Sequence, residues 1–186
     1  MRTPLAGLLR AGRLGHAAGA PGLHLRERNP AAAAIARRGA AALPDLPQRP
    51  GCVTMGTAEF IWTGPGLWLA LDPAPEGLAR FGLARALAER FGQDASITDL
   101  TGARAILRLH GPAVRDTLAK LVPIDLDDSV FPAGSAAVTL AGHVGVTLWR
   151  PTPGDWDIAC YRSFGASLLH DVLEAAAEFG CEVTPG

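Results

Sequence analysis

The chain has few cysteines and almost no lysine, and both shortages limit the chemistry it can perform. Its 186 residues include three cysteines, Cys52, Cys160 and Cys181, with no Cys-x-x-Cys pair. This odd count and spacing suit neither a disulfide framework nor a zinc knuckle. Reduced thiols in a cytoplasmic protein are therefore expected. Only Lys120 among the 17 basic residues is lysine, and the net charge is −1. Such a balance favours neither nucleic acid nor an anionic membrane as a partner.

Motifs for catalysis, cofactors and membranes are missing as well. The 22 glycines form no Gly-x-Gly-x-x-Gly loop and no Walker-type loop, so dinucleotide or flavin binding by a Rossmann-type loop is not expected. There is no Gly-x-Ser-x-Gly elbow and no His-Glu-x-x-His motif. No uncharged apolar run approaches the roughly 18 residues of a membrane-spanning helix. Arg10 and Arg13 interrupt the apolar core that a secretory signal would need.

The composition nevertheless predicts a well-packed protein. Hydrophobic residues make up 48% of the chain and charged residues 19%, which argues against disorder. Residues 1–20 are rich in Gly, Ala and Arg and are expected to form an N-terminal arm. Two further segments, 21–95 and 96–186, are expected to be halves of one compact unit.

Local patterns predict strands and helices in residues 21–95. Alternating apolar residues predict a strand over 22–28, and Pro30 with the alanines after it predicts a helix over 31–43. Strands are predicted over 54–63 and 67–71 around the turn Gly64-Pro65-Gly66. Apolar residues at helical spacing predict a helix over 78–91, which Gly92 ends.

A similar order is predicted for residues 96–186. The sequence predicts a strand over 103–110, a helix after Gly111-Pro112, a hairpin of 136–141 and 144–149 around Gly142-His143, and a strand over 156–160. Ser163 is expected to cap a last helix, over 164–179. We therefore predict an α+β fold of two related β-α-β-β-α halves, with antiparallel sheets and the helices packed on one side.

The acidic residues and thiols are interpreted as structural. Asp125, Asp127 and Asp128 follow a proline break and are expected to form a solvated loop that caps backbone N–H groups. A binding role would need convergent arginines, which the sequence does not place. Asp99 precedes Thr101-Gly102 and is expected to form an Asx turn. Cys160 is expected to be a core thiol, and no catalytic, cofactor-binding or metal-binding residue is predicted.

Five residues are predicted to contact a partner protein. Leu5, Leu8 and Leu9 lie together in the arm, which has too few apolar residues to build a core, and a groove on a partner could accept them. Deleting residues 2–20 is thus expected to weaken assembly more than folding. The pair Trp149-Arg150 has a composition common at interfaces. The tryptophans can equally be core residues or interface anchors: Trp62, Trp68, Trp149 and Trp156.

An ordered set of short motifs resembles a known protein family. Its members are Pro4-Leu5-Ala6-Gly7, Gly64-Pro65-x-x-Trp68-Leu69, Asp99-Leu-Thr-Gly, Leu107-x-Leu-x-Gly111-Pro112, Leu118-x-Lys120, Ile124-Asp125-Leu126, Phe131-Pro132, Trp149-Arg150 and Arg162-Ser163-Phe164. This set resembles the gamma subunit of heterotetrameric sarcosine oxidase, and the resemblance covers most of the chain. The family is similar in fold to the folate-binding domains of the aminomethyltransferase group.

The resemblance implies a non-catalytic structural subunit. The complex oxidatively demethylates sarcosine to glycine with tetrahydrofolate as one-carbon acceptor. Its cofactors FAD, FMN, NAD, tetrahydrofolate and zinc are expected in the partner alpha, beta and delta subunits, and none in this chain. The alternatives are a stand-alone folate-binding one-carbon transferase-like protein, and a tRNA-modification or iron–sulfur assembly factor of the same fold group. Neighbouring reading frames for large flavin-type subunits would favour the first interpretation.

Overall fold

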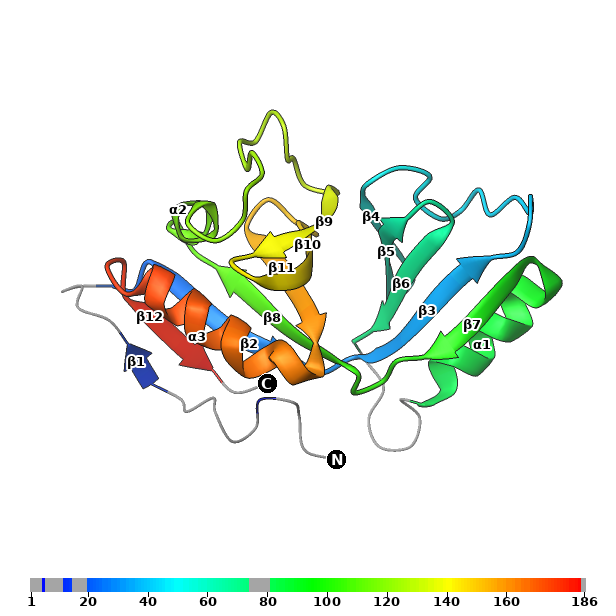
Figure 1. Ribbon diagram of the computed structural model, residues 1–186, viewed down its shortest axis with the longest axis horizontal. Coiled ribbons are helices and arrows are strands. Elements are labelled where there is room, and N and C mark those ends of the chain that lie inside the picture. The colour runs from blue at the N-terminus through cyan, green and yellow to red at the C-terminus, as the bar shows by residue number, and fades with distance from the viewer. Residues whose placement is uncertain (1–4, 6–11, 15–19, 74–80, 185–186) are drawn as a thin grey trace.

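The strands form two sheets of unequal size. The computed structural model describes residues 5, 12–14, 20–73 and 81–184, which form an α+β fold with two mostly antiparallel sheets and three α-helices (Figure 1). The seven-stranded sheet has, in spatial order, β1 (Gly12–Leu14), β12 (Cys181–Thr184), β2 (Leu23–Arg28), β8 (Arg104–His110), β11 (Asp155–Tyr161), β10 (Val144–Trp149) and β9 (Ala136–Ala141). The five-stranded sheet has β4 (Cys52–Met55), β5 (Ala58–Gly64), β6 (Leu67–Asp72), β3 (Ala31–Arg37) and β7 (Ala95–Asp99).

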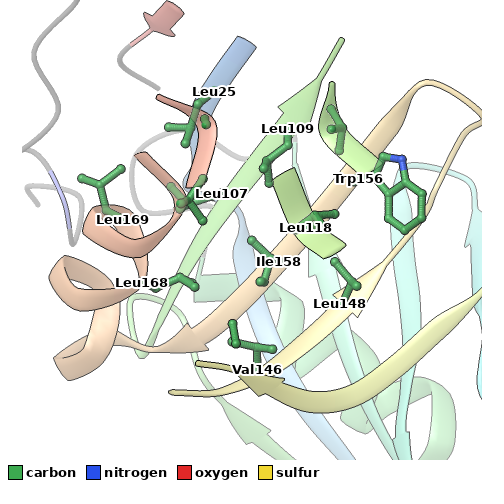
Figure 2. Close-up of a cluster of buried hydrophobic side chains, with 14 of the residues drawn as sticks. Leu25, Leu107, Leu109, Leu118, Val146, Leu148, Trp156, Ile158, Leu168 and Leu169 are labelled. Atoms are coloured by element: carbon green, nitrogen blue, oxygen red, sulfur yellow. The ribbon is translucent and has the colours of Figure 1, made fainter. Parts of the chain in front are cut away.

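Helices cover the outer face of each sheet. The helix α3 (Gly165–Ala176) and the short α2 (Val114–Ala119) bury Leu168, Val172 and Leu118 in one apolar cluster with strands β8, β10 and β11 (Figure 2). The helix α1 (Leu83–Phe91) buries Leu87 and Phe91 against the five-stranded sheet. Figure 1 shows α3 and α1 on the outer sides of the two sheets. The order of layers is therefore helix, sheet, sheet, helix.

A third apolar cluster joins the two sheets face to face. Ile106, Trp149 and Ala159 of the seven-stranded sheet pack with Ile61 and Leu71 of the five-stranded sheet. Trp149 is fully buried there. The space between the sheets is therefore a core in its own right, and the charged residues described below lie at its margin.

In the described part of the chain, the backbone passes from one sheet to the other at two places. Asn29 and Pro30 separate β2 from β3, and residues 100–103 separate β7 from β8. The second crossing is held by backbone hydrogen bonds, because Leu100 N donates to Ala32 O at 2.8 Å. Thr101 N donates to Asp99 Oδ1 at 2.8 Å, which confirms the Asx turn expected at Asp99.

The structure corrects the expected helix over 31–43. Residues Ala31–Arg37 form β3, which pairs with β6 on one side and β7 on the other. Alanine favours helix when nothing else decides, but here the small side chains are buried on both faces of a central strand. The helical propensity of this segment is overridden by packing between α1 and the seven-stranded sheet.

Smaller differences concern two other segments. The strand expected over 54–63 is a hairpin of β4 and β5, which turns at Gly56 with φ +62°. Ser163 is not a helix cap but lies inside the 3₁₀ turn η3 (Arg162–Phe164), and α3 begins at Gly165 without a side-chain cap. Phe164, the first residue of the helix expected over 164–179, lies in η3 and is 49% exposed.

The expected pair of similar halves is also revised. Residues 21–95 contribute β2 to β6 and then α1, so the order β-α-β-β-α does not occur there. Each sheet takes a strand from the other segment, because β2 joins the seven-stranded sheet and β7 joins the five-stranded sheet. The β12–β2 pair is parallel, so the larger sheet is not wholly antiparallel. None of the helices in the described part of the chain has the length and apolar character needed to span a membrane.

Candidate functional site

Four charged side chains meet at the margin of the space between the sheets. Arg28 lies at the end of β2, Arg108 in β8 and Asp157 in β11, all in the seven-stranded sheet, while Glu59 extends from β5 of the other sheet. Asp157 has no exposed surface, and Arg28 and Glu59 are less than a tenth exposed. We call these four residues the ion cluster. It has two positive and two negative charges, so its net charge is zero.

The pairing within the ion cluster is dense. Arg28 donates from Nη2 to Glu59 Oε1 at 2.6 Å and from Nη1 to Glu59 Oε2 at 3.0 Å, and Nη1 also reaches Asp157 Oδ2 at 2.6 Å. Arg108 donates from Nε to Asp157 Oδ1 at 2.8 Å and from Nη2 to Asp157 Oδ2 at 2.6 Å. The hydrogen bond to Asp157 raises the pKa of Arg108. Paired arginine and carboxylate groups in this geometry fix the two sheets relative to each other.

Neighbouring strands explain why the ion cluster forms. Arg108 and Asp157 are register partners on adjacent antiparallel strands, which places their side chains on the same face. Trp149 Nε1 is 3.4 Å from Glu59 Oε2 and adds a weak donor to that carboxylate. Both carboxylates are thus occupied by donors of the chain itself. The arrangement suits a structural lock better than a general acid or base.

The cysteines are unsuited to nucleophilic chemistry. All three are free thiols. Burial, reinforced by the negative charges of Glu59 and Asp157, raises the pKa of Cys52 to about 12. Burial likewise raises the pKa of Cys160 and of Cys181 to about 11. Since the thiolate is the reactive form, these thiols are poor nucleophiles near neutral pH.

Cys52 also lines a groove on the surface of the described residues. This groove has a volume of about 710 Å³ and lies between residues 45–53, which contribute the lining prolines Pro47 and Pro50, and residues 129–135, which contribute Pro132. Cys52 N donates to Gly134 O at 2.7 Å and ties the two loops together. Within the described residues, no group of three or more His, Cys, Asp and Glu is arranged to hold a metal ion.

Trp149 and Arg150, expected at a partner surface, are buried inside the chain. Trp149 belongs to the core between the sheets. Of the two roles considered for it, core residue or interface anchor, the structure therefore supports the core residue. Arg150 is 7% exposed and donates to Asp128 Oδ1 at 2.6 Å and to Phe131 O at 3.0 Å. Its guanidinium lies 4.8 Å from the ring centre of Trp156. Any partner contact in this region therefore falls on other, exposed side chains.

The acidic loop behaves largely as expected. Asp125 Oδ1 accepts from Asp127 N at 2.9 Å, and Asp127 Oδ1 accepts from Ser129 N at 2.9 Å. Hydrogen bonds from Ser129 lower the pKa of Asp127, with a smaller effect from Arg115. The loop is a capped turn, as predicted. Asp128 differs from this expectation, because it forms an ion pair with Arg150. The sequence alone did not predict which arginine lies beside it.

The arm residue Leu5 lies in this chain's own core. It is 1% exposed, belongs to the cluster beneath α3, and its N–H donates to Glu27 Oε1 at 3.0 Å. The strand β1 within the arm pairs with β12. Leu5 is therefore a core residue, contrary to the expectation that it contacts a partner, while the expected effect of deleting residues 2–20 stays a prediction. Leu8 and Leu9 lie outside the described residues, so a partner contact there stays a prediction.

Sequence reasoning missed the ion cluster, although a signal was present. Arg108 interrupts the apolar run from Ala105 to Leu109, and Asp157 stands between Trp156 and Ile158 in a strand that is otherwise buried. A charged residue inside a strand of this kind needs a partner of opposite charge. The pairing of these residues with Arg28 and Glu59 could not be read from the sequence, because it depends on which strands become neighbours.

Comparisons with known proteins identify the family. A family model described as the sarcosine oxidase, gamma subunit family matches residues 27–178. The sarcosine oxidase subunit gamma of Corynebacterium sp. (strain P-1) is 36% identical over 140 residues, covering 74% of this chain and 66% of the relative. That of Arthrobacter sp. is 33% identical over 153 residues, covering 81% of this chain and 73% of the relative.

Solved structures agree with this assignment. A chain of heterotetrameric sarcosine oxidase from Corynebacterium sp. U-96, solved in complex with pyrrole 2-carboxylate, matches with a TM-score of 0.78 and 26% identity over 96% of both chains. Aminomethyltransferase T of the glycine cleavage system from Bartonella henselae matches in fold, with a TM-score of 0.67 and 14% identity over 99% of this chain and 59% of that one. Because the family model covers most of the sequence and the relatives exceed 30% identity, the chain belongs to the sarcosine oxidase gamma subunit family.

Proposed function

We propose that this chain is the gamma subunit of a heterotetrameric sarcosine oxidase and acts there as a non-catalytic structural subunit. The observation that carries the proposal is the family match over residues 27–178, together with the likeness to a chain of a solved heterotetrameric sarcosine oxidase. Its partners are the alpha, beta and delta subunits. In this proposal the complex works in the cytoplasm and oxidatively demethylates sarcosine to glycine, with tetrahydrofolate accepting the one-carbon unit.

The non-catalytic role is supported by the chemistry of the described residues. The buried carboxylates Glu59 and Asp157 accept hydrogen bonds from arginines of the same chain, and the thiol of Cys52 is protonated near neutral pH. A group already engaged in this way has little capacity to move protons for a substrate. We therefore assign the FAD, FMN, NAD, tetrahydrofolate and zinc of the complex to the partner subunits.

Co-expression tests the proposal directly. The chain is produced with the alpha, beta and delta subunits of the same genome, with an affinity tag on the alpha subunit, and the purified complex is assayed for sarcosine-dependent peroxide release. We expect the chain to be recovered at one copy per complex. Omitting its gene is the matched control and should lower the yield or thermal stability of the remaining subunits. Failure of the chain to co-purify would refute the assembly role.

The isolated chain tests the non-catalytic part of the proposal. It is expected to be colourless and to release no peroxide with sarcosine above the background of heat-treated protein. Titration with tetrahydrofolate in a calorimeter examines the alternative of a stand-alone folate-binding transferase-like protein. Bound flavin, turnover of sarcosine, or stoichiometric binding of tetrahydrofolate by the chain alone would contradict a purely structural role.

A further inference from the structure

One corner of the larger sheet's inner face is left uncovered by the smaller sheet. Side chains alternate along a strand, so Arg104 and Ile106 of β8 point to the same face, as do Ala159 and Tyr161 of β11. Ile106 and Ala159 are buried against the five-stranded sheet. Further along the same two strands, Arg104 and Tyr161 line an open groove of about 350 Å³. The groove therefore continues from the apolar core between the sheets.

The walls of this groove are unusually apolar for an exposed surface. Leu67 of β6 is 47% exposed, Val138 of β9 is 54% exposed, Tyr161 is 59% exposed and Phe164 of η3 is 49% exposed, and all four line it. Leu140, 51% exposed, lies two residues beyond Val138 on the same face of β9. Half of the exposed large apolar side chains in the described part of the chain thus border one groove. Contiguous exposure of this kind marks an interaction site.

The charge in the groove has no counterion there. Among the described residues that line it, Arg104 is the one charged residue and none carries a carboxylate. The Arg104 guanidinium lies 4.0 Å from the ring centre of Tyr161, and its Nε is buried without a hydrogen-bond partner. A planar guanidinium that lacks a counterion in its own chain is well suited to pair with a carboxylate. The complement of the groove is thus an apolar segment that carries an acidic side chain.

We propose that this groove is a docking surface for a neighbouring subunit, which inserts an apolar segment whose carboxylate pairs with Arg104. The inference rests on the proposed function, because it takes the partner to be another protein of the sarcosine oxidase complex. Aromatic and arginine side chains beside aliphatic ones are the composition found at the centre of protein interfaces. The lone positive charge selects among partners by requiring a negative one.

Gly145 offers a way to block the groove without touching the core. It lies in β10, its φ is not positive, and a Cβ built there meets no atom within 4 Å. Gly145→Leu therefore fills the groove while the chain folds normally. Gly82→Leu is the matched control, because Gly82 has the same free space, a φ of −79° and a position before α1 that is outside the groove.

Arg104 provides an independent test through charge. Arg104→Glu removes the proposed ion pair and repels the partner's carboxylate, whereas Arg104→Lys retains a positive charge. Arg85→Glu, on the exposed face of α1, is the control for a change of net charge. We expect Gly145→Leu and Arg104→Glu to weaken binding of the other subunits at least about tenfold, and Arg104→Lys to retain part of it. Both control variants should bind as the unchanged chain does.

Affinity is measured on the complex by biolayer interferometry, with the other three subunits immobilised together. Hydrogen exchange on the unchanged chain adds a readout that needs no variant: amides of 136–141 and 161–164 should exchange more slowly in the complex. Full affinity of both groove variants, or unchanged exchange in these segments, overturns the inference. Self-association of the isolated chain that Gly145→Leu abolishes would assign the groove to a second copy and overturn it too. If the unchanged chain itself fails to bind, the proposed function has failed instead.

Discussion

Removing the carboxylate of Asp157 should destabilise the chain more than almost any other single change to a charged residue. Asp157 has no exposed surface and accepts hydrogen bonds from both Arg28 and Arg108. In Asp157→Ala the two guanidinium groups keep their charges and Arg28 stays buried, while Glu59 and, 3.9 Å from Arg108, the partly exposed Asp155 are the carboxylates that remain near them. The variant thus leaves the positive charge of Arg28 and Arg108 only partly compensated.

The size of the effect follows from this geometry. Two unit charges about 4 Å apart attract by roughly 4 kcal/mol at an effective dielectric constant near 20. Removing one partner of a buried pair typically costs about 3–5 kcal/mol. The free energy of unfolding of an ordinary domain is about 5–15 kcal/mol, so Asp157→Ala should consume a large part of it. Asp157→Asn retains the volume and one acceptor oxygen and should cost less.

Urea unfolding followed by tryptophan fluorescence is a suitable assay, because Trp149 lies beside Glu59 in the same region. A slope of about 1–3 kcal/mol per molar urea converts the expected loss into a midpoint shift of at least about 1 M. The control is Glu89→Ala, which breaks an exposed pair with Arg85 within α1 and should cost no more than about 0.5 kcal/mol. If Asp157→Ala and Glu89→Ala unfold at the same urea concentration, the ion cluster does not hold the sheets together.

Three further predictions concern the core, the arm and the thiols. Leu168→Ala should lower the free energy of unfolding by about 2–5 kcal/mol, measured by calorimetry, because Leu168 is fully buried. Phe164→Ala, at a half-exposed site, should change it little. Equal effects of the two variants would contradict the packing of α3. Leu5→Ala should lower the free energy of unfolding by a similar amount. An unchanged melting temperature would indicate that the arm acts in assembly and not in folding. Folding raises the pKa of Cys52 to about 12 and those of the other two cysteines to about 11, so stability should be greatest below about pH 8.5 and fall as the pH rises toward 11. At pH 8 iodoacetamide should label folded Cys52 at least about 100-fold more slowly than the chain in urea, and comparable rates would show that the thiol is not shielded.

The sequence predicted those elements whose signals are local. The hairpin of β9 and β10 around Gly142-His143 has its expected bounds, because a two-residue turn with glycine first fixes the register of the strands beside it. The helix α1 ends at Gly92 as expected, although it begins only at Leu83. Val144, Val146 and Leu148 all enter one core cluster, as the alternation along their strand indicated.

The failures arose where distant parts of the chain decide the structure. An alanine-rich segment is helical in isolation, but Ala31–Arg37 is a strand because β6 and β7 pair with it from both sides. The same limit applied to the site. Nothing in the sequence distinguishes Arg28 and Glu59 from other charged residues. Their ion pair forms only because β2 of one sheet and β5 of the other lie close together in the fold. The sequence likewise did not single out Arg104. Its lack of a counterion among the described residues of the groove depends on which part of the larger sheet the smaller sheet leaves uncovered.

The exchange of strands between the sheets has a consequence for how the chain is synthesised. The strand β2 lies between β12 and β8, so its two neighbours are Cys181–Thr184 and Arg104–His110. When residues 23–28 leave the ribosome, both of those neighbours are still untranslated. The strand β2 must therefore wait, with Leu23 and Leu25 exposed, until nearly all the rest has emerged. Such long-range pairing slows folding and leaves a nascent chain open to aggregation. A ribosome-bound chain stalled after residue 150 should consequently be sensitive to protease throughout β2 and protected by chaperones that bind apolar strands.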